Sequence, residues 1–218
     1  MQTKKGPNIL ITGTPGTGYS YCRKCFVSKK WKKIDFGKTK KGKTTLSSQV
    51  AENAKMKHIE VSRIIEQYEL HDGWDEEFEC FNLNEDKVSF VHCYSIPKFI
   101  LQWKKVCDEL EKHMQEGNVV VDFHSCDFFP ERWFDLVVVL RASNDILYPR
   151  LEKRGYSAKK IQENIEAEIF QVLLDEAKDS YKSEIVVELQ SNSVEEMEKN
   201  LENTLKWISE WRRMRGIN

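Results

Sequence analysis

The sequence predicts an α/β fold in which helices cover both faces of a doubly wound parallel sheet. Continuous apolar runs at 8–12, 119–122 and 136–140 have the length of strands that are buried on both faces. Helical patterns separate these runs, so strands and helices alternate along the chain. The 218 residues suit one domain with small appendages, which buries about 70% of the surface that the unfolded chain exposes.

The first half contains two expected strands and two expected helices. Asn8–Thr12 is an apolar, partly β-branched run, and a helix is expected to begin near Lys43. A short strand at 58–61 precedes Ser62, which could cap a helix that runs to Leu70. The acidic stretch 72–86 has no clear period, and we expect a surface loop there.

The middle of the chain predicts an interrupted helix followed by central strands. The helix would start near Glu85, break around Pro97, resume over Cys107–Met114 and end at Gly117. The runs at 119–122 and 136–141 then follow as buried strands.

The last third predicts three helices and one more strand. Asn144 could cap a helix to about Arg154, although Pro149 inside it would cost around 3 kcal/mol. One helical stripe is expected from Ile161, Ile165, Ile169, Val172, Leu173 and Ala177. A strand at 185–189 precedes Ser193-x-x-Glu196, a capping box that opens an amphipathic final helix.

Composition limits the classes of partner and compartment. With 34 basic and 35 acidic side chains the formal charge is −1, so bulk charge favours no nucleic-acid partner, although 23–43 is locally basic and 72–86 acidic. Six cysteines lack the spacing of a secreted scaffold, which favours a reducing compartment. Cys22-x-x-Cys25 is half of a metal or redox motif without a second half, and no apolar run approaches the ~20 residues of a membrane span.

A glycine-rich phosphate loop follows the first strand, but it is split. Gly13-Thr-Pro-Gly16-Thr-Gly18 supplies the first half of Gly-x-x-x-x-Gly-Lys-[Ser/Thr], and Lys43-Thr44-Thr45 supplies the second after residues 19–42. In such a loop backbone N–H groups and the lysine hold phosphates, and the hydroxyl binds Mg²⁺. Gly37 to Thr44 is also a formal match, but it lacks a good preceding strand, so we favour the assembled loop.

Three further side chains could complete a phosphoryl-transfer site. Asp122 ends an apolar strand and could be the second Mg²⁺ carboxylate, although such an aspartate often only caps a turn. His124 could orient a water or an acceptor phosphate, or could be purely structural. Arg154, in a short turn before Tyr156, could close over phosphates as part of a lid, or could merely complement a helix dipole.

The assembled motifs resemble the adenylate kinase isoenzyme 6 family. The resemblance covers nearly the whole chain, and it is carried by Gly13–Gly18 with Lys43-Thr44-Thr45, and by the stretches 121–134, 154–156 and 168–172. Of these, Asp122-Phe-His124-Ser-Cys-Asp-Phe-Phe-Pro-Glu-Arg-Trp-Phe134 is the most specific. The Arg132 and Trp133 within it have no obvious chemical role, whereas Arg141 is expected on the ligand side of the sheet.

This resemblance implies a P-loop NTPase fold, NMP-kinase-like, with a short NMP-binding region at 60–83 and a lid at 153–163 in a single domain. It implies the reaction ATP + AMP ⇌ 2 ADP with Mg²⁺, an ATPase activity, AMP or another NMP as acceptor, and a monomer. In this resemblance the nucleotide loop corresponds to Gly16, Gly18, Lys43, Thr44 and Thr45. The Walker-B-like motif corresponds to Asp122 and His124, and the lid arginine corresponds to Arg154. It further implies a role in small-subunit rRNA maturation through a small-subunit ribosomal protein and the pre-ribosome, in the nucleus and cytoplasm.

Two segments depart from the family pattern. Residues 19–42 split the loop, and residues near 89–106 split the helix that should join 85–88 to 107–110. Their composition suggests translated intron or mispredicted exon sequence, a hypothesis that transcript reads across both junctions would overturn. We expect the sheet to fold, but ATP affinity to be severely reduced unless the first insert bulges outward. A weakly or non-catalytic ribosome-assembly binding protein is therefore the alternative function.

Overall fold

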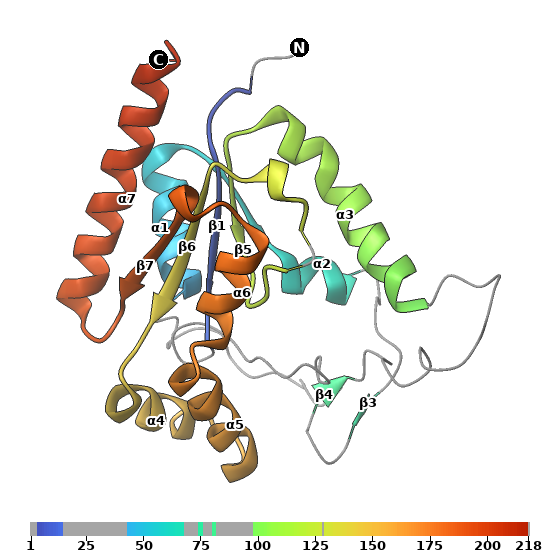
Figure 1. The fold of residues 1–218 in the computed structure, drawn as a ribbon, viewed down its shortest axis with the longest axis vertical. Helices are drawn as coiled ribbons and strands as arrows, with labels where there is room; N and C mark the ends of the chain where they lie inside the picture. Colours follow the sequence, from blue (N-terminus) through green and yellow to red (C-terminus); the bar gives the residue numbers. More distant parts are fainter. Residues whose placement is uncertain are drawn as a thin grey trace.

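The computed structural model describes residues 4–14, 43–67, 74–75, 80–81, 98–127 and 129–217. A five-stranded sheet lies at the centre, with helices on both of its faces (Figure 1). The predicted fold class, a doubly wound parallel sheet of the P-loop NTPase type, is therefore confirmed.

The sheet places the first strand of the chain at its centre. Its strands are β1 (Asn8–Gly13), β2 (Lys57–Glu60), β5 (Val119–Asp122), β6 (Leu136–Arg141) and β7 (Val186–Gln190), in the order β2-β5-β1-β6-β7. Every pairing within this sheet is parallel. β1 and β5 are buried along their whole lengths, as their continuous apolar sequences predict.

Each face of the sheet has its own hydrophobic core. On one face, Ile9 and Ile11 of β1 pack with α1 (Lys43–Ala54) and α7 (Val194–Met214). On the other, Leu10 packs with α3 (Lys98–Glu116) and α6 (Val172–Ser180). The alternation of side chains along a strand sends neighbours to opposite faces, and this explains why an unbroken apolar run serves two helical layers.

The remaining elements are short. They are α2 (Val61–Gln67), α4 (Asn144–Glu152), α5 (Ala158–Ile169), the 3₁₀ turns Glu131–Trp133 and Ser183–Ile185, and an antiparallel pair β3 (Trp74–Asp75) and β4 (Cys80–Phe81). The acidic stretch predicted as a plain loop thus contains a two-stranded ribbon. Among the described residues no helix has the length and apolar character that crossing a membrane requires.

Two predicted helices differ from the structure. α3 begins at Lys98 and not at Cys107, because Pro97 precedes its first residue, where proline is compatible with a helix start. The stripe expected as one helix is two, α5 and α6, because Gln171 adopts the left-handed conformation with φ 55°. The break leaves Ile169 53% exposed, so this position does not belong to the core stripe.

Several helix ends are shifted by one residue or more. β2 ends at Glu60, and Val61 already begins α2, so Ser62 lies inside the helix and does not cap it. Ser143, not Asn144, is the N-cap of α4, which accommodates Pro149 and ends at Glu152. The predicted capping box is confirmed at its first bond, because Ser193 Oγ accepts from the N–H of Glu196; the Glu196 carboxylate accepts from Asn192 N–H at 2.6 Å.

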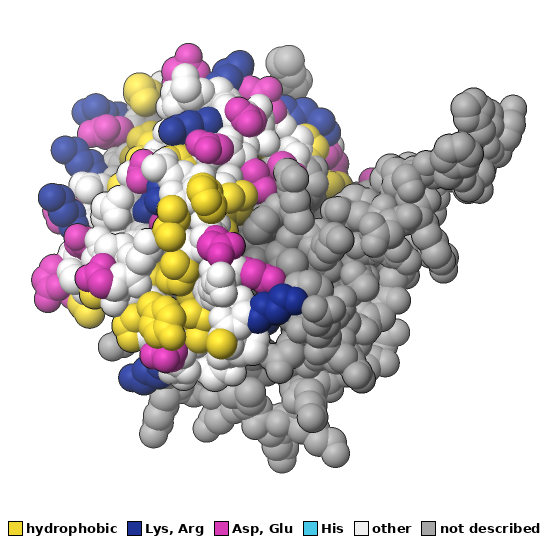
Figure 2. All heavy atoms as spheres, turned by 60° about the horizontal axis from the view of Figure 1, so that its bottom comes forward, with side chains coloured by type: hydrophobic (Ala, Val, Ile, Leu, Met, Phe, Trp, Pro, Cys, Tyr) yellow, Lys and Arg dark blue, Asp and Glu magenta, His cyan; other side chains and the backbone are white. Residues whose placement is uncertain are grey.

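The surface of the described residues carries both charge signs. Figure 2 shows acidic and basic side chains interspersed on one face, with a band of hydrophobic side chains between them. Among the exposed large hydrophobic residues are Phe170 (69% exposed) and Tyr148 (49%). This surface agrees with the near-zero net charge of the sequence.

Candidate active site

The carboxyl edge of the sheet gathers most of the described candidate residues. Gly13, Asp122 and Arg141 are the last residues of β1, β5 and β6, and Ile11 of β1 pairs with Asp122. Gly13 has φ +154°, which L side chains rarely adopt, so glycine suits the point where the chain leaves the sheet. Ligands of open α/β sheets bind at this edge.

Lys43 and Asp122 form the centre of the site. Lys43 is the first residue of α1, its side chain is 1% exposed, and its Nζ lies 3.5 Å from Oδ1 of Asp122, which is 5% exposed. Burial lowers the pKa of Lys43, the charge and hydrogen bond of Asp122 act in the opposite direction, and the positive charge of Arg154 lowers it further. An incoming anion would therefore stabilise the charged form of this lysine.

His124 is buried beside the same lysine. Burial, and then the charge of Lys43, hold the pKa of His124 well below its usual value of 6.5, so the imidazole is neutral near pH 7. A neutral ring can accept or donate a hydrogen bond but carries no charge toward a phosphate. Phe123 packs against it with ring centroids 4.2 Å apart.

Arg154 lies in the turn between α4 and α5, as the sequence predicts. Gly155 follows with φ +74°, and Ser157 caps α5 by accepting from Lys160 N–H at 3.3 Å. The guanidinium of Arg154 acts electrostatically on Lys43 and on Arg150. The structure therefore brings Lys43, Asp122, His124 and Arg154 into one electrostatic neighbourhood.

Thr44 and Asp122 fit a magnesium ion by their donor chemistry. A half-buried hydroxyl next to Lys43 and a buried carboxylate are hard oxygen ligands of the kind that Mg²⁺ prefers. Within the described ranges no group of three or more His, Cys, Asp or Glu could hold a metal by itself. Mg²⁺ would thus take its remaining ligands from water and phosphate, as it usually does.

Some predicted residues lie outside the described part of the chain. These are Gly16, Gly18, residues 37–42 of the alternative loop, Cys22 and Cys25, and most of the NMP-binding region at 60–83. Thr45 is described, within the first turn of α1, where its carbonyl accepts from Ser48 Oγ at 2.9 Å. Whether Gly18 and Lys43 adjoin remains a prediction.

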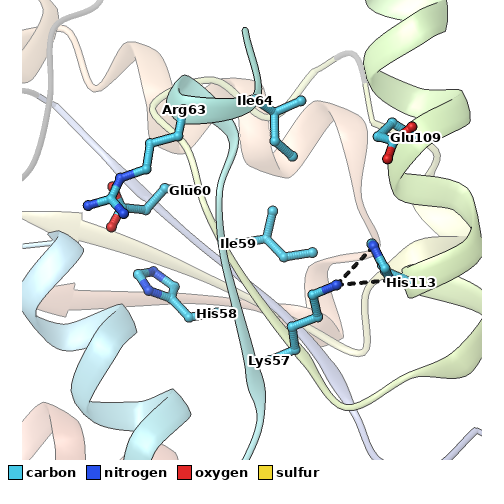
Figure 3. Close-up of a pocket in the computed structure, with 8 residues that line it drawn as sticks. All are labelled: Lys57, His58, Ile59, Glu60, Arg63, Ile64, Glu109 and His113. Atoms are coloured by element: carbon cyan, nitrogen blue, oxygen red, sulfur yellow. Dashed lines mark hydrogen bonds and ion pairs between the residues drawn. The ribbon is translucent and has the colours of Figure 1, made fainter. Parts of the chain in front are cut away.

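A separate pocket of about 290 Å³ lies along β2 between α2 and α3 (Figure 3). Lys57 Nζ donates to His113 Nε2 at 2.9 Å, and Arg63 pairs with Glu60 at 2.7 Å. Its lining comprises Lys57, His58, Ile59, Glu60, Arg63, Ile64, Glu109 and His113. Glu60, Arg63 and Ile64 belong to the NMP-binding region predicted at 60–83, but none of the eight was singled out as a site residue, because the pocket forms only when α3 packs beside the edge strand.

Two arginines find partners that their sequence positions did not reveal. Arg141 does lie at the carboxyl edge, but it pairs with Glu168 and Glu188. Arg132 pairs with Glu111 at 3.0 Å, and the buried Trp133 donates from Nε1 to the same carboxylate at 2.8 Å. Arg132 and Trp133 thus both bind the Glu111 carboxylate, a partner that explains residues for which the sequence indicated no chemical role.

Known proteins of similar sequence identify the family. A family model described as an AAA domain matches residues 97–171. The adenylate kinase isoenzyme 6 homolog of Dictyostelium discoideum is 46% identical over 205 residues, which cover 94% of this chain and 93% of that protein. The homolog of Caenorhabditis elegans is 41% identical over 211 residues, covering 97% and 94%. This chain belongs to the adenylate kinase isoenzyme 6 family.

Solved structures agree with the fold of this adenylate kinase isoenzyme 6 family member. Shikimate kinase from Acinetobacter baumannii, solved with shikimate, has a TM-score of 0.55 at 12% identity and covers 94% of this chain and 93% of its own. Shikimate kinase from Bacteroides thetaiotaomicron has a TM-score of 0.51 at 15% identity, covering 93% and 98%. At these identities the likeness shows the kinase-like fold, and the sequence relatives show the adenylate kinase family.

Proposed function

We propose that this chain transfers the γ-phosphoryl group of ATP to AMP or another nucleoside monophosphate, with ADP as product, and that it also hydrolyses ATP. One observation carries the proposal: the buried Lys43 opens α1 with its Nζ 3.5 Å from Asp122 at the carboxyl end of β5. A lysine and a carboxylate in these positions are the two charged parts of a P-loop phosphate site. Membership of the adenylate kinase isoenzyme 6 family supports the same reaction.

Each described residue has a role that follows from its charge and position. Lys43 neutralises the negative charge of the β- and γ-phosphate oxygens. The N–H groups at the start of α1 add the positive end of the helix dipole, which also attracts the phosphates. Arg154 approaches the transferring group from the lid turn. His124, neutral and buried, orients the acceptor phosphate or an attacking water by a hydrogen bond.

Thr44 and Asp122 are the residues that would hold Mg²⁺. A bound magnesium ion supplies charge neutralisation between the β- and γ-phosphates. The Thr44 hydroxyl and the Asp122 carboxylate would orient that charge, and Lys43 Nζ lies 3.5 Å from the same carboxylate.

The cellular role rests on the family resemblance. We propose that the chain acts as a monomer in small-subunit rRNA maturation, contacts a small-subunit ribosomal protein on the pre-ribosome, and occurs in the nucleus and cytoplasm. Co-sedimentation of the full chain with small-subunit precursors in sucrose gradients tests this part. Absence from those fractions, together with normal rRNA processing after depletion, would refute it.

A weakly or non-catalytic ribosome-assembly binding protein is the second candidate. The observation that favours it is the 24-residue separation (42 − 18) between Gly18 and Lys43. Closing such a segment costs about 3 kcal/mol beyond a constant, which a stable domain tolerates, but the segment must leave and return beside the phosphates.

Deletion of residues 19–42 separates the two candidates. ADP formation from ATP and AMP is measured for the full chain and for the deletion variant at equal folded concentration. Rescue from near zero would identify the segment as inhibitory, and equal activity would mean that the split loop already works. No activity in either form would refute the kinase proposal and favour the binding role.

A further inference from the structure

A buried carboxylate outside the predicted site joins the nucleotide side of the sheet to the helix that follows the lid. Glu168 lies in the last turn of α5 and is 2% exposed. Burying a carboxylate is costly unless several donors satisfy it. The groups that donate hydrogen bonds to the Glu168 carboxylate therefore identify the segments that this residue holds in position.

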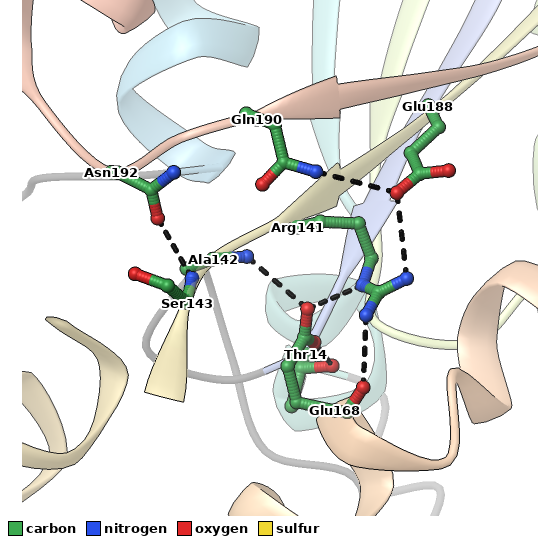
Figure 4. Close-up of polar contacts among 8 residues, drawn as sticks. All are labelled: Thr14, Arg141, Ala142, Ser143, Glu168, Glu188, Gln190 and Asn192. Atoms are coloured by element: carbon green, nitrogen blue, oxygen red, sulfur yellow. Dashed lines mark hydrogen bonds and ion pairs between the residues drawn. The ribbon is translucent and has the colours of Figure 1, made fainter. Parts of the chain in front are cut away.

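Those donors come from the carboxyl ends of two adjacent strands. The Thr14 hydroxyl, directly after β1, donates to one carboxylate oxygen, and the other accepts from Arg141 Nε and, at 3.1 Å, from Ala142 N–H. Arg141 Nη2 also donates to the backbone carbonyl of Glu168 at 2.9 Å. Figure 4 shows the Glu168 side chain reaching toward Thr14 and Arg141 together.

The C-terminal end of α5 is held in place both by the Glu168 carboxylate and by helix α6, which follows it. Gln171, with φ 55°, is the N-cap of α6, whose Leu174 and Ala177 are buried in the core beside Leu10 of β1. At its other end α5 begins at Ala158, four residues after Arg154. A rigid helix of 12 residues, about 18 Å long, thus runs from the lid turn to Glu168.

Thr14 is the point at which this connection meets the phosphate loop. It follows Gly13, is 2% exposed, and is the last described residue before the glycine-rich segment. A hydroxyl held by a charged acceptor fixes both the side-chain rotamer and the backbone that carries it. The backbone of Thr14, at the end of β1, is therefore held partly by α5.

We propose that Glu168 is a positioning residue for the nucleotide loop, which acts by holding Thr14 through its buried carboxylate and links the loop to the lid through α5. The inference rests on the proposed function, since it assumes that the residues after Thr14 receive nucleotide phosphates. Glu168 touches no reacting atom in this account. Its effect is on how well the loop is preorganised for phosphate binding.

Thr14→Val tests the inference because it removes the hydroxyl and keeps the shape. Thr14→Ser, which keeps the hydroxyl, is the rescue variant. Thr204→Val is the matched control, since Thr204 is also buried (3% exposed) and its Oγ1 donates to Asn200 O at 2.7 Å within α7. The dissociation constant for MgATP, and kcat and KM for ATP hydrolysis, are measured for all three in the full chain.

We expect Thr14→Val to raise the dissociation constant and KM by about tenfold, the size expected for one lost hydrogen bond to a charged group, with kcat changed less than about threefold. Thr14→Ser and Thr204→Val should stay within about twofold of the wild type, inside the usual scatter of neutral changes. Wild-type affinity and KM in Thr14→Val, or an equal loss in Thr204→Val, would overturn the inference.

Amide hydrogen exchange keeps this test independent of the proposed function. In the nucleotide-free chain, exchange in the peptide that spans residues 9–18 should quicken in Thr14→Val and not in Thr204→Val. If the wild type binds no ATP but this difference appears, the proposed function fails and the link from Glu168 to Thr14 stands. If exchange is unchanged in Thr14→Val, the inference fails whatever the wild type binds.

Discussion

At the residue scale, the contact of Lys43 with Asp122 decides the character of the site. Both side chains are almost completely buried, so each has lost most of its hydration, and their mutual attraction compensates only part of that cost. The burial that lowers the pKa of Lys43 makes the site unfavourable for an isolated cation and favourable for a cation that meets a phosphate. The pair is thus better suited to ligand binding than to stability.

A double-mutant cycle of Lys43→Met and Asp122→Asn should reveal strong coupling. We expect a coupling free energy of unfolding of about 1–3 kcal/mol, because each single change leaves the other charge buried without its partner. Urea denaturation of the four proteins measures it. The more exposed pair Arg63 and Glu60 is the matched control, where Arg63→Met and Glu60→Gln should couple by less than about 0.5 kcal/mol. Equal coupling in both pairs would contradict this account of burial.

Cys107 should be a slow and strongly pH-dependent thiol. Its pKa is raised to about 11 by burial and then by the charges of Asp108 and Glu111. Because the thiolate is the reactive form, alkylation by iodoacetamide should accelerate about tenfold per pH unit from 7 to 9. Mass spectrometry of the Cys107 peptide measures the rate.

The Glu111→Gln variant tests whether the charge of Glu111 slows or speeds the alkylation of Cys107. Removal of this negative charge lowers the pKa of Cys107, so the variant should react faster than the wild type at pH 8. The fully buried Cys126, whose pKa burial raises further, should stay unmodified in the native protein and serves as the internal control. An unchanged rate in Glu111→Gln would show that the charge has no such influence, and a slower rate would show an influence of the opposite sign.

At the element scale, helix caps differ measurably between α7 and α4. Ser193 Oγ accepts from Glu196 N–H at 3.2 Å, whereas the N-cap Ser143 of α4 makes no side-chain capping bond. Ser193→Ala should therefore lower the free energy of unfolding by about 1 kcal/mol, and Ser143→Ala by less than half as much. Thermal unfolding of both variants provides the comparison. An equal loss at the two serines would mean that the capping bond of Ser193 adds nothing.

The sequence predicted a strand or helix correctly where one local pattern determines the element. The strands at 8–13, 119–122 and 136–141 are mostly apolar because both faces are covered, and the start of α1 at Lys43 follows from the amphipathic run after it. The break between α5 and α6 could not be predicted, because the apolar spacing continues through it. Gln171 adopts a left-handed backbone at this break, and α6 then packs against β1 and β6.

At the scale of the whole molecule, the site depends on contacts between distant parts of the sequence. Lys43 and Asp122 could be named in advance because each belongs to a local motif. The role of Glu168 could not, because Thr14 lies 154 residues away, although Glu168 begins one of the stretches that carry the family resemblance. The part of the pocket beside β2 that α3 lines could not be predicted for the same reason, since α2 and α3 contribute to it from separate stretches.

Nucleotide binding should stabilise the whole fold, because the site draws on β1, α1, β5 and the lid turn together. At MgATP one hundred times above its dissociation constant, the free energy of unfolding should rise by about 2.7 kcal/mol, and the melting temperature of a chain of this size by roughly 5–10 °C. Differential scanning fluorimetry of the full chain measures the shift.

Three comparisons show where this stabilisation arises. Lys43→Met should abolish most of the shift at the same MgATP concentration, because the phosphates lose their buried counter-charge, whereas the exposed control Arg63→Met should keep it. EDTA should reduce the rise in melting temperature of the wild type, since Thr44 and Asp122 would hold Mg²⁺ against the phosphates. In the variant that lacks residues 19–42, a larger shift would locate the penalty on binding in that segment. A full shift in Lys43→Met would mean that ATP binds elsewhere than at the carboxyl edge of the sheet.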